Sequence, residues 1–445
     1  MGDKSERKIV GGRVAIVGTG SRAAMFIRGI VERPASAVVA ILEPNTIRAA
    51  YYNDLLKSLG APTVPVYKPE QLKAMLTTEK VDAIVVTCID ALHHLYIIPA
   101  LEAGVQVLTE KPMTTDADKC RAILETVQRT GRHLTVTFNY RYNPVHELVK
   151  RTIAEGKIGY RWFSVISIHF EWLLDTVHGA DYFRRWHRQK SNSGGLMVHK
   201  SGHHFDLVNW WIDSEPETVA GMGKTAFYGK EAGTKNGWAK DYVRARGSEE
   251  ARKDPFAMHM EMDETLQKLY AEAESDDGYH RDMNVFGPDI AIEDDMSVMV
   301  RYKSGVTLTY HLTAYSPWEG YRVMFNGSEG RLELDVVESE YRSPSDGEGL
   351  GGLIHGAKSL PHAGGATVTL QRLWEKPQQL PVSIDHSAHG GGDTRMLSVL
   401  FGAKPGQEQS ANERDGAMAL AVGVCANESF KTGNFIDVAS LNLPW

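Results

Sequence analysis

Hydrophobic positions in the first third of the chain form short continuous runs separated by helical patterns. The apolar runs predict buried strands at residues 14–17, 38–42, 83–87, 105–108 and 134–138. Segments with apolar residues three and four apart predict helices between them, at 22–32, 47–59, 70–76, 94–103 and 118–130. Strands without a polar face that alternate with helices predict a parallel sheet covered by helices on both sides.

After Asn143 the pattern changes to alternation of apolar and polar residues. It is seen in WFSVISIHF from Trp162, MSVMVRYKSGVTLTYHL from Met296 and YRVMFNGSEGRLELDV from Tyr321. This period of two predicts antiparallel strands with one face on a core. We therefore expect an α/β domain with a parallel sheet at 1–140, then an α+β domain with an open, mostly antiparallel sheet at 141–445. The charged, irregular stretch at about 224–289 is expected to be an insertion.

Composition narrows the classes of function. The 445 residues carry a formal net charge of -7, which argues against a nucleic-acid partner. The three cysteines, Cys88, Cys120 and Cys425, are too few and too far apart for a disulfide framework. No apolar stretch approaches the ~20 residues of a membrane span, and the charged N-terminal segment lacks the apolar core of a signal peptide. We therefore expect a cytoplasmic protein without membrane contact.

The first predicted strand ends in a glycine-rich turn, Gly18-Thr19-Gly20-Ser21-Arg22-Ala23. Its spacing is G-x-G-x-x-G/A, which is typical of dinucleotide-binding turns, with alanine in the third place. Gly18 suits the tight turn, Gly20 lets a pyrophosphate approach the backbone, and the next helix offers free amides at its N-terminus. The residues predicted to bind the cofactor here are Gly18, Gly20, Ser21, Arg22 and Ala23.

Glu43 ends the next predicted strand, about 20 residues after the turn. A carboxylate at this place can accept hydrogen bonds from both ribose hydroxyls and repels a 2′-phosphate, so NAD is favoured over NADP. Arg22 lies near the phosphates and leaves NADP open. The alternative is a purely structural turn with Glu43 as a surface acid.

A second motif, VQVLTEKPMTTD, places Glu110-Lys111-Pro112 at the carboxyl end of a predicted strand. Ligands gather at that edge of open α/β sheets. Pro112 keeps Lys111 out of helical geometry and can aim its side chain into the crevice. Beside a nicotinamide cation the pKa of such a lysine falls, so Lys111 can act as an acid or a base. The alternative is a solvated lysine at a strand end.

These motifs follow one another in the order glycine turn, VTCIDALHHLYIIPALEAG from Val86, Glu110-Lys111-Pro112 and FNYRYNP from Phe138. In this order and spacing the sequence resembles the Gfo/Idh/MocA oxidoreductases. The resemblance implies a Rossmann domain, a C-terminal α/β domain with an open sheet, NAD(P), and a sugar or polyol substrate. It also implies that Lys111 is catalytic, that Glu110 and His93 lie near the cofactor, and that the protein is a homodimer or homotetramer.

The segment SNSGGLMVHKSGHHFDLVNWW from Ser191 carries a histidine cluster. On a helix His199 and His203 share a face, and Asp206 follows one turn later. Members of the family that it resembles carry aspartate, histidine and aspartate at these positions, so His203 and Asp206 match and His199 replaces the first aspartate. A neutral histidine can donate or accept a proton, and we expect His203 and His199 to be catalytic with Lys111. Zinc is the alternative, but there is no H-E-x-x-H pattern and no nearby cysteine, so no metal is expected.

Basic residues crowd the stretch before and within this cluster, although the net charge of the chain is negative. They are Arg184, Arg185, His187, Arg188, Lys190 and Lys200. One interpretation is a solvated basic face. The other is a pocket for an anionic substrate such as a uronate or a sulfosugar, because arginine binds carboxylate and sulfonate in bidentate fashion. In that hypothesis the substrate is bound by Arg184, Arg185, His187 and Lys200, together with Tyr140 and Asp206.

Three functions are compatible with these residues. The first is an NAD-dependent dehydrogenase that moves a hydride between a sugar ring carbon, C3 in our expectation, and NAD, while Lys111 or His203 takes the hydroxyl proton. The second is a redox-neutral glycoside hydrolase, for example of sulfoquinovosides. It needs further acid/base groups, for which the candidates are His199, Glu171, Asp175, His178, Asp181 and the stretch HSAHGGGD from His386. The third is a non-catalytic NAD-binding regulator, which the presence of Lys111 disfavours.

Overall fold

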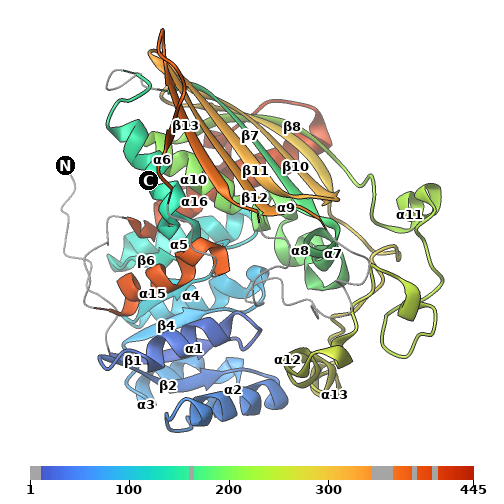
Figure 1. Cartoon of the computed structure of the whole chain (residues 1–445). Coiled ribbons are helices and arrows are strands. Elements are labelled where there is room, and N and C mark those ends of the chain that lie inside the picture. Colours follow the sequence, from blue (N-terminus) through green and yellow to red (C-terminus); the bar gives the residue numbers. More distant parts are fainter. Residues whose placement is uncertain (1–11, 160–164, 342–363, 383–387, 403–408) are drawn as a thin grey trace.

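The computed structural model describes residues 12–159, 165–341, 364–382, 388–402 and 409–445. These residues form two sheets, and both are packed against helices (Figure 1). The parallel sheet occupies the lower part of Figure 1, and the larger sheet stands above it.

Within the described residues the N-terminal sheet has seven strands, in the order β15-β6-β5-β4-β1-β2-β3. Its parallel strands are β1 (Gly12–Val17), β2 (Ser36–Leu42), β3 (Val66–Tyr67), β4 (Ala83–Val86), β5 (Gln106–Thr109) and β6 (Leu134–Val136). Its helices are α1 (Ala23–Val31), α2 (Thr46–Ser58), α3 (Leu72–Thr78), α4 (His93–Glu102) and α5 (Ala117–Thr130). The central residues of β1 have no exposed surface, as a strand with both faces covered requires. The predicted parallel α/β sheet is confirmed.

The far end of the chain completes this sheet. Strand β15 (Ala411–Asn412) pairs antiparallel with β6 at the sheet edge. Helix α15 (Gly392–Phe401) packs on α1, where a Cβ added to Gly29 would lie 2.7 Å from a methyl group of Leu397. The side chains of Met396, Leu397, Leu400 and Phe401 therefore belong to the same apolar core as β1 and α1. The cofactor half of the molecule thus includes residues from both ends of the sequence.

The second sheet has nine strands among the described residues, in the order β14-β13-β12-β11-β7-β10-β9-β8-β16. They are β7 (Val165–Asp175), β8 (Pro216–Lys224), β9 (Asp295–Tyr302), β10 (Thr307–Ser316), β11 (Glu319–Gly327), β12 (Gly330–Ser339), β13 (Ala366–Arg372), β14 (Gln378–Leu380) and β16 (Ile436–Asp437). Only β7 and β10 pair in parallel. Burial alternates along β9, which confirms the predicted pattern of one face on a core.

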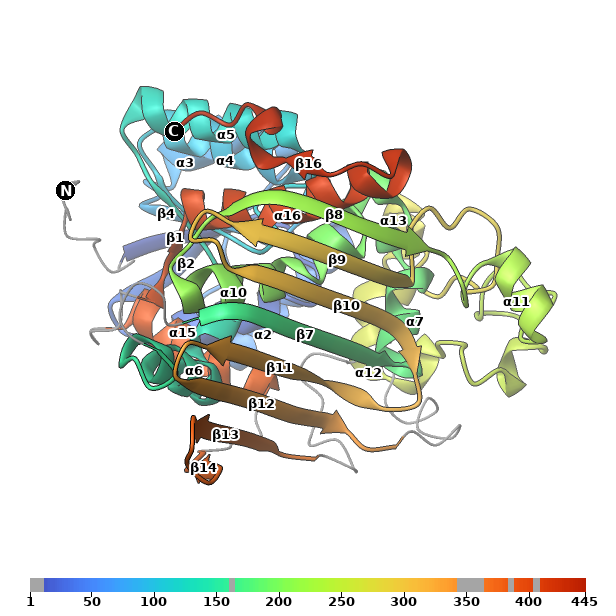
Figure 2. The same cartoon turned by 90° about the horizontal axis from the view of Figure 1, so that it is seen from above.

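Helices cover one face of this sheet, which Figure 2 shows from its other side. The helices of the second half are α6 (Pro144–Ala154), α7 (Thr176–Arg184), α8 (Lys190–Ser193), α9 (Leu196–His199), α10 (Gly202–Ile212) and α16 (Glu413–Thr432). Helix α16 begins with a reciprocal capping box between Asn412 and Asp415. Buried aromatic rings fill the layer beneath the sheet, with Trp172 stacked between His204 and Tyr321 at centroid distances of 4.0 and 4.1 Å.

The predicted insertion lies between β8 and β9. It contains three short α-helices among the described residues: α11 (Lys230–Asn236), α12 (Glu264–Leu266) and α13 (Glu274–Asp277). In Figure 1, α11 projects from the body of the molecule, whereas α12 and α13 lie beside α2 of the parallel-sheet half. The insertion therefore reaches from one sheet to the cofactor edge of the other. No helix in the described part of the chain is long and apolar enough to span a membrane.

Candidate active site

The glycine turn follows β1 at the carboxyl edge of the parallel sheet. Gly18 has φ +83, and a Cβ there would lie 2.7 Å from backbone atoms of Cys88, so only glycine fits. At Gly20 an added Cβ would meet only the Tyr270 hydroxyl, at 3.7 Å, so this side of the turn is open to close approach. Helix α1 starts directly after Arg22 and has no side-chain cap. These features fit the pyrophosphate cradle of a dinucleotide.

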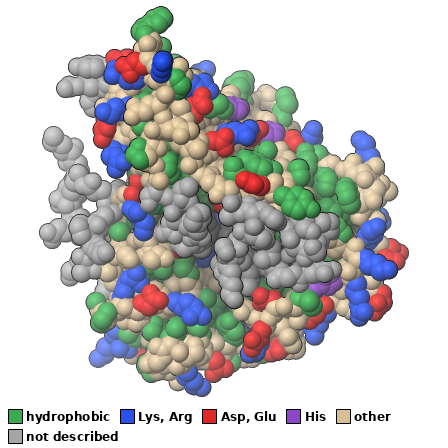
Figure 3. All heavy atoms as spheres, viewed as in Figure 1, with side chains coloured by type: hydrophobic (Ala, Val, Ile, Leu, Met, Phe, Trp, Pro, Cys, Tyr) green, Lys and Arg blue, Asp and Glu red, His purple; other side chains and the backbone are tan. Residues whose placement is uncertain are grey.

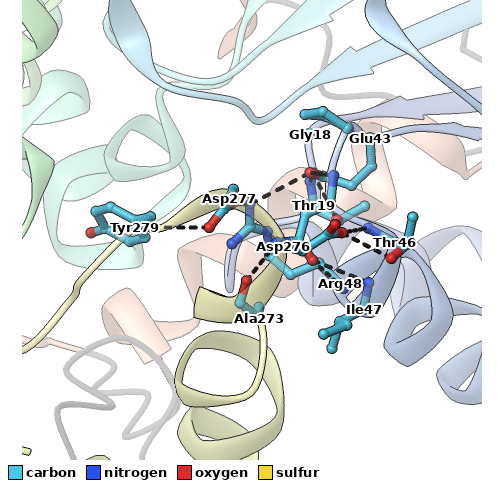
Figure 4. Close-up of polar contacts among 12 residues, drawn as sticks. Gly18, Thr19, Glu43, Thr46, Ile47, Arg48, Ala273, Asp276, Asp277 and Tyr279 are labelled. Carbon is cyan, nitrogen blue, oxygen red and sulfur yellow. Dashed lines mark hydrogen bonds and ion pairs between the residues drawn. The ribbon is translucent and has the colours of Figure 1, made fainter.

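Glu43 lies at the carboxyl end of β2, beside this turn (Figure 4). Its Oε2 accepts hydrogen bonds from the backbone amide and the hydroxyl of Thr19, both at 2.8 Å. Its Oε1 accepts one from the Asn45 amide at 2.8 Å and lies 3.6 Å from a guanidinium nitrogen of Arg48. Glu43 is buried, and its bonds to Thr19 hold the glycine turn against the end of β2. Its carboxylate already has four protein contacts at the place where the ribose is expected.

Arg22 ties the turn to two other segments. Its Nε donates to Glu110 at 2.7 Å, and its two terminal nitrogens donate to the carboxylate of Asp393, both at 3.0 Å. Burial alone would lower the pKa of Arg22, but the charges of Asp393 and Glu110 outweigh it and raise that pKa. Asn139 donates a further hydrogen bond to Asp393 at 2.7 Å. Arg22 and Glu110 thus hold together the ends of β1 and β5.

The side chain of Lys111 extends from the end of β5 to the second half of the molecule. Its Nζ donates to the carbonyl oxygen of His199 at 3.1 Å and lies 3.4 Å from Nε2 of the same residue. Burial lowers the pKa of Lys111 to about 8, although the negative charges of Asp90 and Glu110 act in the opposite direction. A lysine with this pKa exchanges its proton near neutral pH, as an acid/base catalyst requires.

His199 is held by a carboxylate that the sequence motifs did not single out. Its Nδ1 lies 2.5 Å from Oδ2 of Asp90, in the 3-10 turn (Asp90–Leu92) that follows β4. Burial and the charge of Lys111 lower the pKa of His199, whereas burial raises the pKa of Asp90 against the pull of Lys111. Nδ1 of His199 thus faces the carboxylate of Asp90, and Nε2 faces Lys111.

Comparison with known proteins decides the family. The family model described as "Oxidoreductase family, NAD-binding Rossmann fold" matches residues 12–138, and the one described as "Oxidoreductase family, C-terminal alpha/beta domain" matches residues 150–438. The chain belongs to the Gfo/Idh/MocA oxidoreductases. It is thus an oxidoreductase with an NAD-binding Rossmann domain, as the order of its motifs predicted.

Three similar proteins illustrate the range of this family. The protein YteT of Bacillus subtilis (strain 168) is 33% identical over 92% of this chain and 94% of its own length. The inositol 2-dehydrogenase of Corynebacterium glutamicum (strain R) is 30% identical over 46% of this chain and 56% of its own length. The WlbA dehydrogenase of Bordetella pertussis, solved with NADH and UDP-GlcNAcA, is 16% identical and has a TM-score of 0.60 over 97% of this chain and 99% of its own. This last likeness concerns the fold.

Of the remaining motif residues in this Gfo/Idh/MocA chain, His203 and Lys200 pack on Tyr140, and His93 lies between the ends of two strands. The ring of His203 stacks on Tyr140 at a centroid distance of 4.2 Å, and the Lys200 ammonium lies 3.5 Å from the Tyr140 hydroxyl. His93 is fully buried, and its two ring nitrogens lie 3.0 Å from the Pro112 carbonyl oxygen and 3.2 Å from that of Cys88. His93 therefore joins the ends of β4 and β5 beneath Lys111.

Asp206 has a partner of its own inside the protein. Its two oxygens accept hydrogen bonds from Arg141 at 2.5 and 2.8 Å, and both side chains are buried. Burial raises the pKa of Asp206 to about 6 against the opposing charge of Arg141. The carboxylate thus forms a buried ion pair with Arg141.

The basic stretch divides into structural and site-facing residues. Arg184 donates two hydrogen bonds to the Phe256 carbonyl oxygen, Arg188 bonds the Pro288 carbonyl oxygen, and Lys190 pairs with Glu293, so these three anchor the insertion. Arg185 shares Asp181 with Arg281, at 2.8 and 3.5 Å. Except for Arg185 and Lys190, which are half-buried, the six basic residues are buried. On the face in Figure 3, exposed acidic and basic side chains are interspersed.

His187 lies against His199. Its ring stacks on Trp186 at 3.5 Å and meets the ring of His199 edge-on at 4.2 Å. Its Nδ1 is buried and has no hydrogen-bond partner in the described part of the chain. Asp90, His187 and His199 each bring one donor atom within 4.8 Å of the others, a set that suits transition metals. The ammonium of Lys111 beside His199 disfavours another cation there, which favours a substrate hydroxyl or anion.

Most of the further acid/base candidates have structural partners. Asp175 caps α7 by accepting from the amides of Val177 and His178, at 2.9 and 2.8 Å. The His178 ring lies 2.7 Å from Glu319 and 3.1 Å from the Tyr182 hydroxyl. Asp181 holds Arg185 and Arg281, and Glu171 lies half-buried on β7. His386 lies outside the described residues. Asp90, which follows a strand at the same edge as Lys111, could have been found from that placement alone.

Proposed function

We propose that this protein is an NAD-dependent dehydrogenase that oxidises a secondary hydroxyl of a sugar or polyol, with C3 of a pyranose as the expected position. One observation carries the proposal: a buried lysine whose pKa is lowered to about 8 meets a carboxylate-held histidine at the cofactor edge of an NAD-binding sheet. The names of the related inositol 2-dehydrogenase and of the aldose-aldose oxidoreductase that shares the fold support the substrate class.

The side chains divide the proton chemistry between them. NAD held at the glycine turn by Gly18, Gly20 and the N-terminus of α1 would supply the hydride acceptor. Neutral Lys111 takes the hydroxyl proton at Nζ, and Nε2 of His199 receives it from there or steadies the resulting ammonium. Asp90 keeps the His199 ring oriented and stabilises it as charge develops. In this proposal His203, whose ring stacks on Tyr140, binds a neighbouring hydroxyl.

We further propose that the substrate carries an anionic group. Two guanidinium groups, those of Arg185 and Arg281, share the single carboxylate of Asp181, so this part of the cluster has an excess of positive charge. The unpartnered Nδ1 of His187 adds a hydrogen-bonding group to the same cluster.

The test compares a neutral sugar with its 6-carboxylate and 6-sulfonate analogues, followed by NADH absorbance. An increase in kcat/KM of about tenfold or more for an anion is expected, and Arg185→Gln should remove most of it. Arg151→Gln, on α6, is a control of equal charge change. Equal kcat/KM values for all three sugars would refute the anionic assignment.

Redox-neutral glycoside hydrolysis is the second candidate. Oxidation at C3 acidifies the C2 proton, which a base removes as the C1–O bond breaks and the aglycone leaves with a proton from an acid. Water then adds its hydroxyl at C1 while a proton returns to C2, and the hydride returns to C3. The His199–Asp90 pair favours this route, because it supplies an acid/base couple in addition to Lys111. Aryl glycosides separate the two functions: aglycone release without net NADH indicates hydrolysis, and stoichiometric NADH indicates the dehydrogenase. Inactivity on every glycoside, sugar and polyol would favour the non-catalytic regulator.

We also propose that the protein is a homodimer or homotetramer associated through the open face of the second sheet. Ile166, Met222 and Met299 are exposed there, on strands β7, β8 and β9. Light scattering after size exclusion measures the mass directly. The variant Met222→Lys should weaken the association, and a monomeric parent protein would contradict the proposal.

A further inference from the structure

The insertion supplies side chains to the cofactor edge of the Rossmann domain. The Tyr270 hydroxyl accepts a hydrogen bond from the Ser21 amide at 3.0 Å and lies 3.3 Å from the Ser21 hydroxyl. The Ala273 carbonyl oxygen accepts one from the Asn45 side chain at 2.9 Å. These contacts join segments more than 200 positions apart and fix the stretch from 270 to 277 over the glycine turn and the start of α2.

Every amide in the first turn of α2 has an acceptor. The side chain of Asn45 accepts from the amides of Ile47 and Arg48, at 3.1 and 3.0 Å. The Asp276 carboxylate accepts from the amide of Thr46 and, at 2.8 Å, from its hydroxyl. Figure 4 shows Asp276 directed at the N-terminus of α2 from the insertion. The protein itself thus provides the anion that a helix N-terminus attracts.

Arg48 also pairs with a carboxylate of the insertion, that of Asp277. Its guanidinium pairs with Asp277 and lies 3.6 Å from Glu43. Only 11% of the Arg48 side chain and 27% of the Asp277 side chain are exposed, so water screens this pair incompletely. The Arg48–Asp277 pair thus lies beside Glu43 at the start of α2 (Figure 4).

In Rossmann domains an arginine near the acidic residue of the second strand accommodates the 2′-phosphate of NADP. Thr46 and Arg48 are such donors here, and both are engaged by carboxylates of the insertion. We propose that Asp276 and Asp277 determine cofactor selectivity by occupying the position of a 2′-phosphate, so that the protein accepts only dinucleotides with a free 2′-hydroxyl. The negative charges of Asp276 and Asp277 repel the added phosphate. The donors that would bind it, Thr46 and Arg48, are already hydrogen-bonded or paired with these two carboxylates. This inference concerns the cofactor alone and does not depend on the proposed substrate.

The experiment measures binding to the intact chain. NADH and NADPH are titrated separately by their fluorescence against the parent protein, Asp277→Asn, and Asp276→Asn combined with Asp277→Asn. The expected result is an NADPH affinity about tenfold higher or more in the double variant, with NADH affinity within about threefold of the parent. The gain should shrink as salt is raised, because it arises from removed charge repulsion.

Asp54→Asn is the matched control, because Asp54 lies on the same helix, 74% of its side chain is exposed, and among the described residues its carboxylate pairs only with Lys57. The single variant keeps the contacts of Asp276 and guards against a misfolded double variant, with circular dichroism as the check of folding. A folded Asp277→Asn protein whose NADPH-to-NADH affinity ratio equals that of the parent overturns the proposal and assigns selectivity to Glu43.

Discussion

Nδ1 of His199 lies 2.5 Å from the carboxylate of Asp90, although the two residues are 109 positions apart. The contact joins the carboxyl edge of the Rossmann sheet to α9 of the second domain. It supplies a carboxylate next to the position where the resemblance leads us to expect an aspartate and where this chain has histidine.

Asp90→Asn should lower kcat by about 10²-fold and change KM little. An amide at this position permits the opposite tautomer of His199, so Nε2 no longer presents the same group to Lys111. Steady-state kinetics at several pH values would reveal the change, because a positioning role also shifts the pH profile. Asp118→Asn, an exposed acid on α5, is the control. A normal kcat in Asp90→Asn would show that the pair is structural.

The pH dependence of both reaction directions follows from Lys111. Its pKa is lowered to about 8, so the neutral amine that alcohol oxidation requires grows as pH rises and predominates above 8. The rate of oxidation should therefore rise through pH 8 and level off, whereas the rate of ketone reduction should fall over the same range. Lys111→Ala should abolish turnover in both directions and keep NADH binding, as fluorescence titration would report. Substantial turnover in Lys111→Ala would refute its catalytic role.

Tyr270→Phe should strengthen NADH binding by about fivefold. The Tyr270 hydroxyl takes the Ser21 amide that the glycine motif offers to the pyrophosphate, and removing one net hydrogen bond of about 1 kcal/mol relieves that competition. Fluorescence titration measures the effect. Tyr51→Phe, on α2, is the control. Weaker NADH binding in Tyr270→Phe would mean that the hydroxyl contacts the cofactor instead of competing with it.

The ion pair of Arg141 and Asp206 predicts a non-additive effect on stability. Asp206→Leu alone leaves a buried guanidinium without its main partner and should cost about 3–5 kcal/mol. Arg141→Met combined with Asp206→Leu should recover much of that loss, because neither charge remains buried. Thermal unfolding of both single variants and the double variant supplies the cycle. Additive losses would show that the two side chains act independently.

The local features of the fold and site were predictable, and the long-range contacts were not. The apolar runs located β1, β2, β4, β5 and β6 but not the two-residue β3, and glycine spacing located the turn, because each depends on neighbouring residues. Asp393 and Tyr270 reach the site from distant segments, and no periodicity in one sequence reports such pairing. The basic stretch shows the same limit: its composition indicated positive charge, but the partners of Arg184, Arg188 and Lys190 belong to the insertion.

The closure of the first sheet by α15 and β15 has a consequence for biosynthesis. A ribosome delivers β1 to β6 long before residues 392–412 leave the exit tunnel. Throughout that interval the nascent Rossmann unit exposes the apolar side of α1 and an unpaired strand edge at β6. Both surfaces promote non-specific association. Stopping translation after residue 140 should therefore yield an aggregation-prone fragment, and a chaperone that shields such surfaces should bind the chain until synthesis is almost complete.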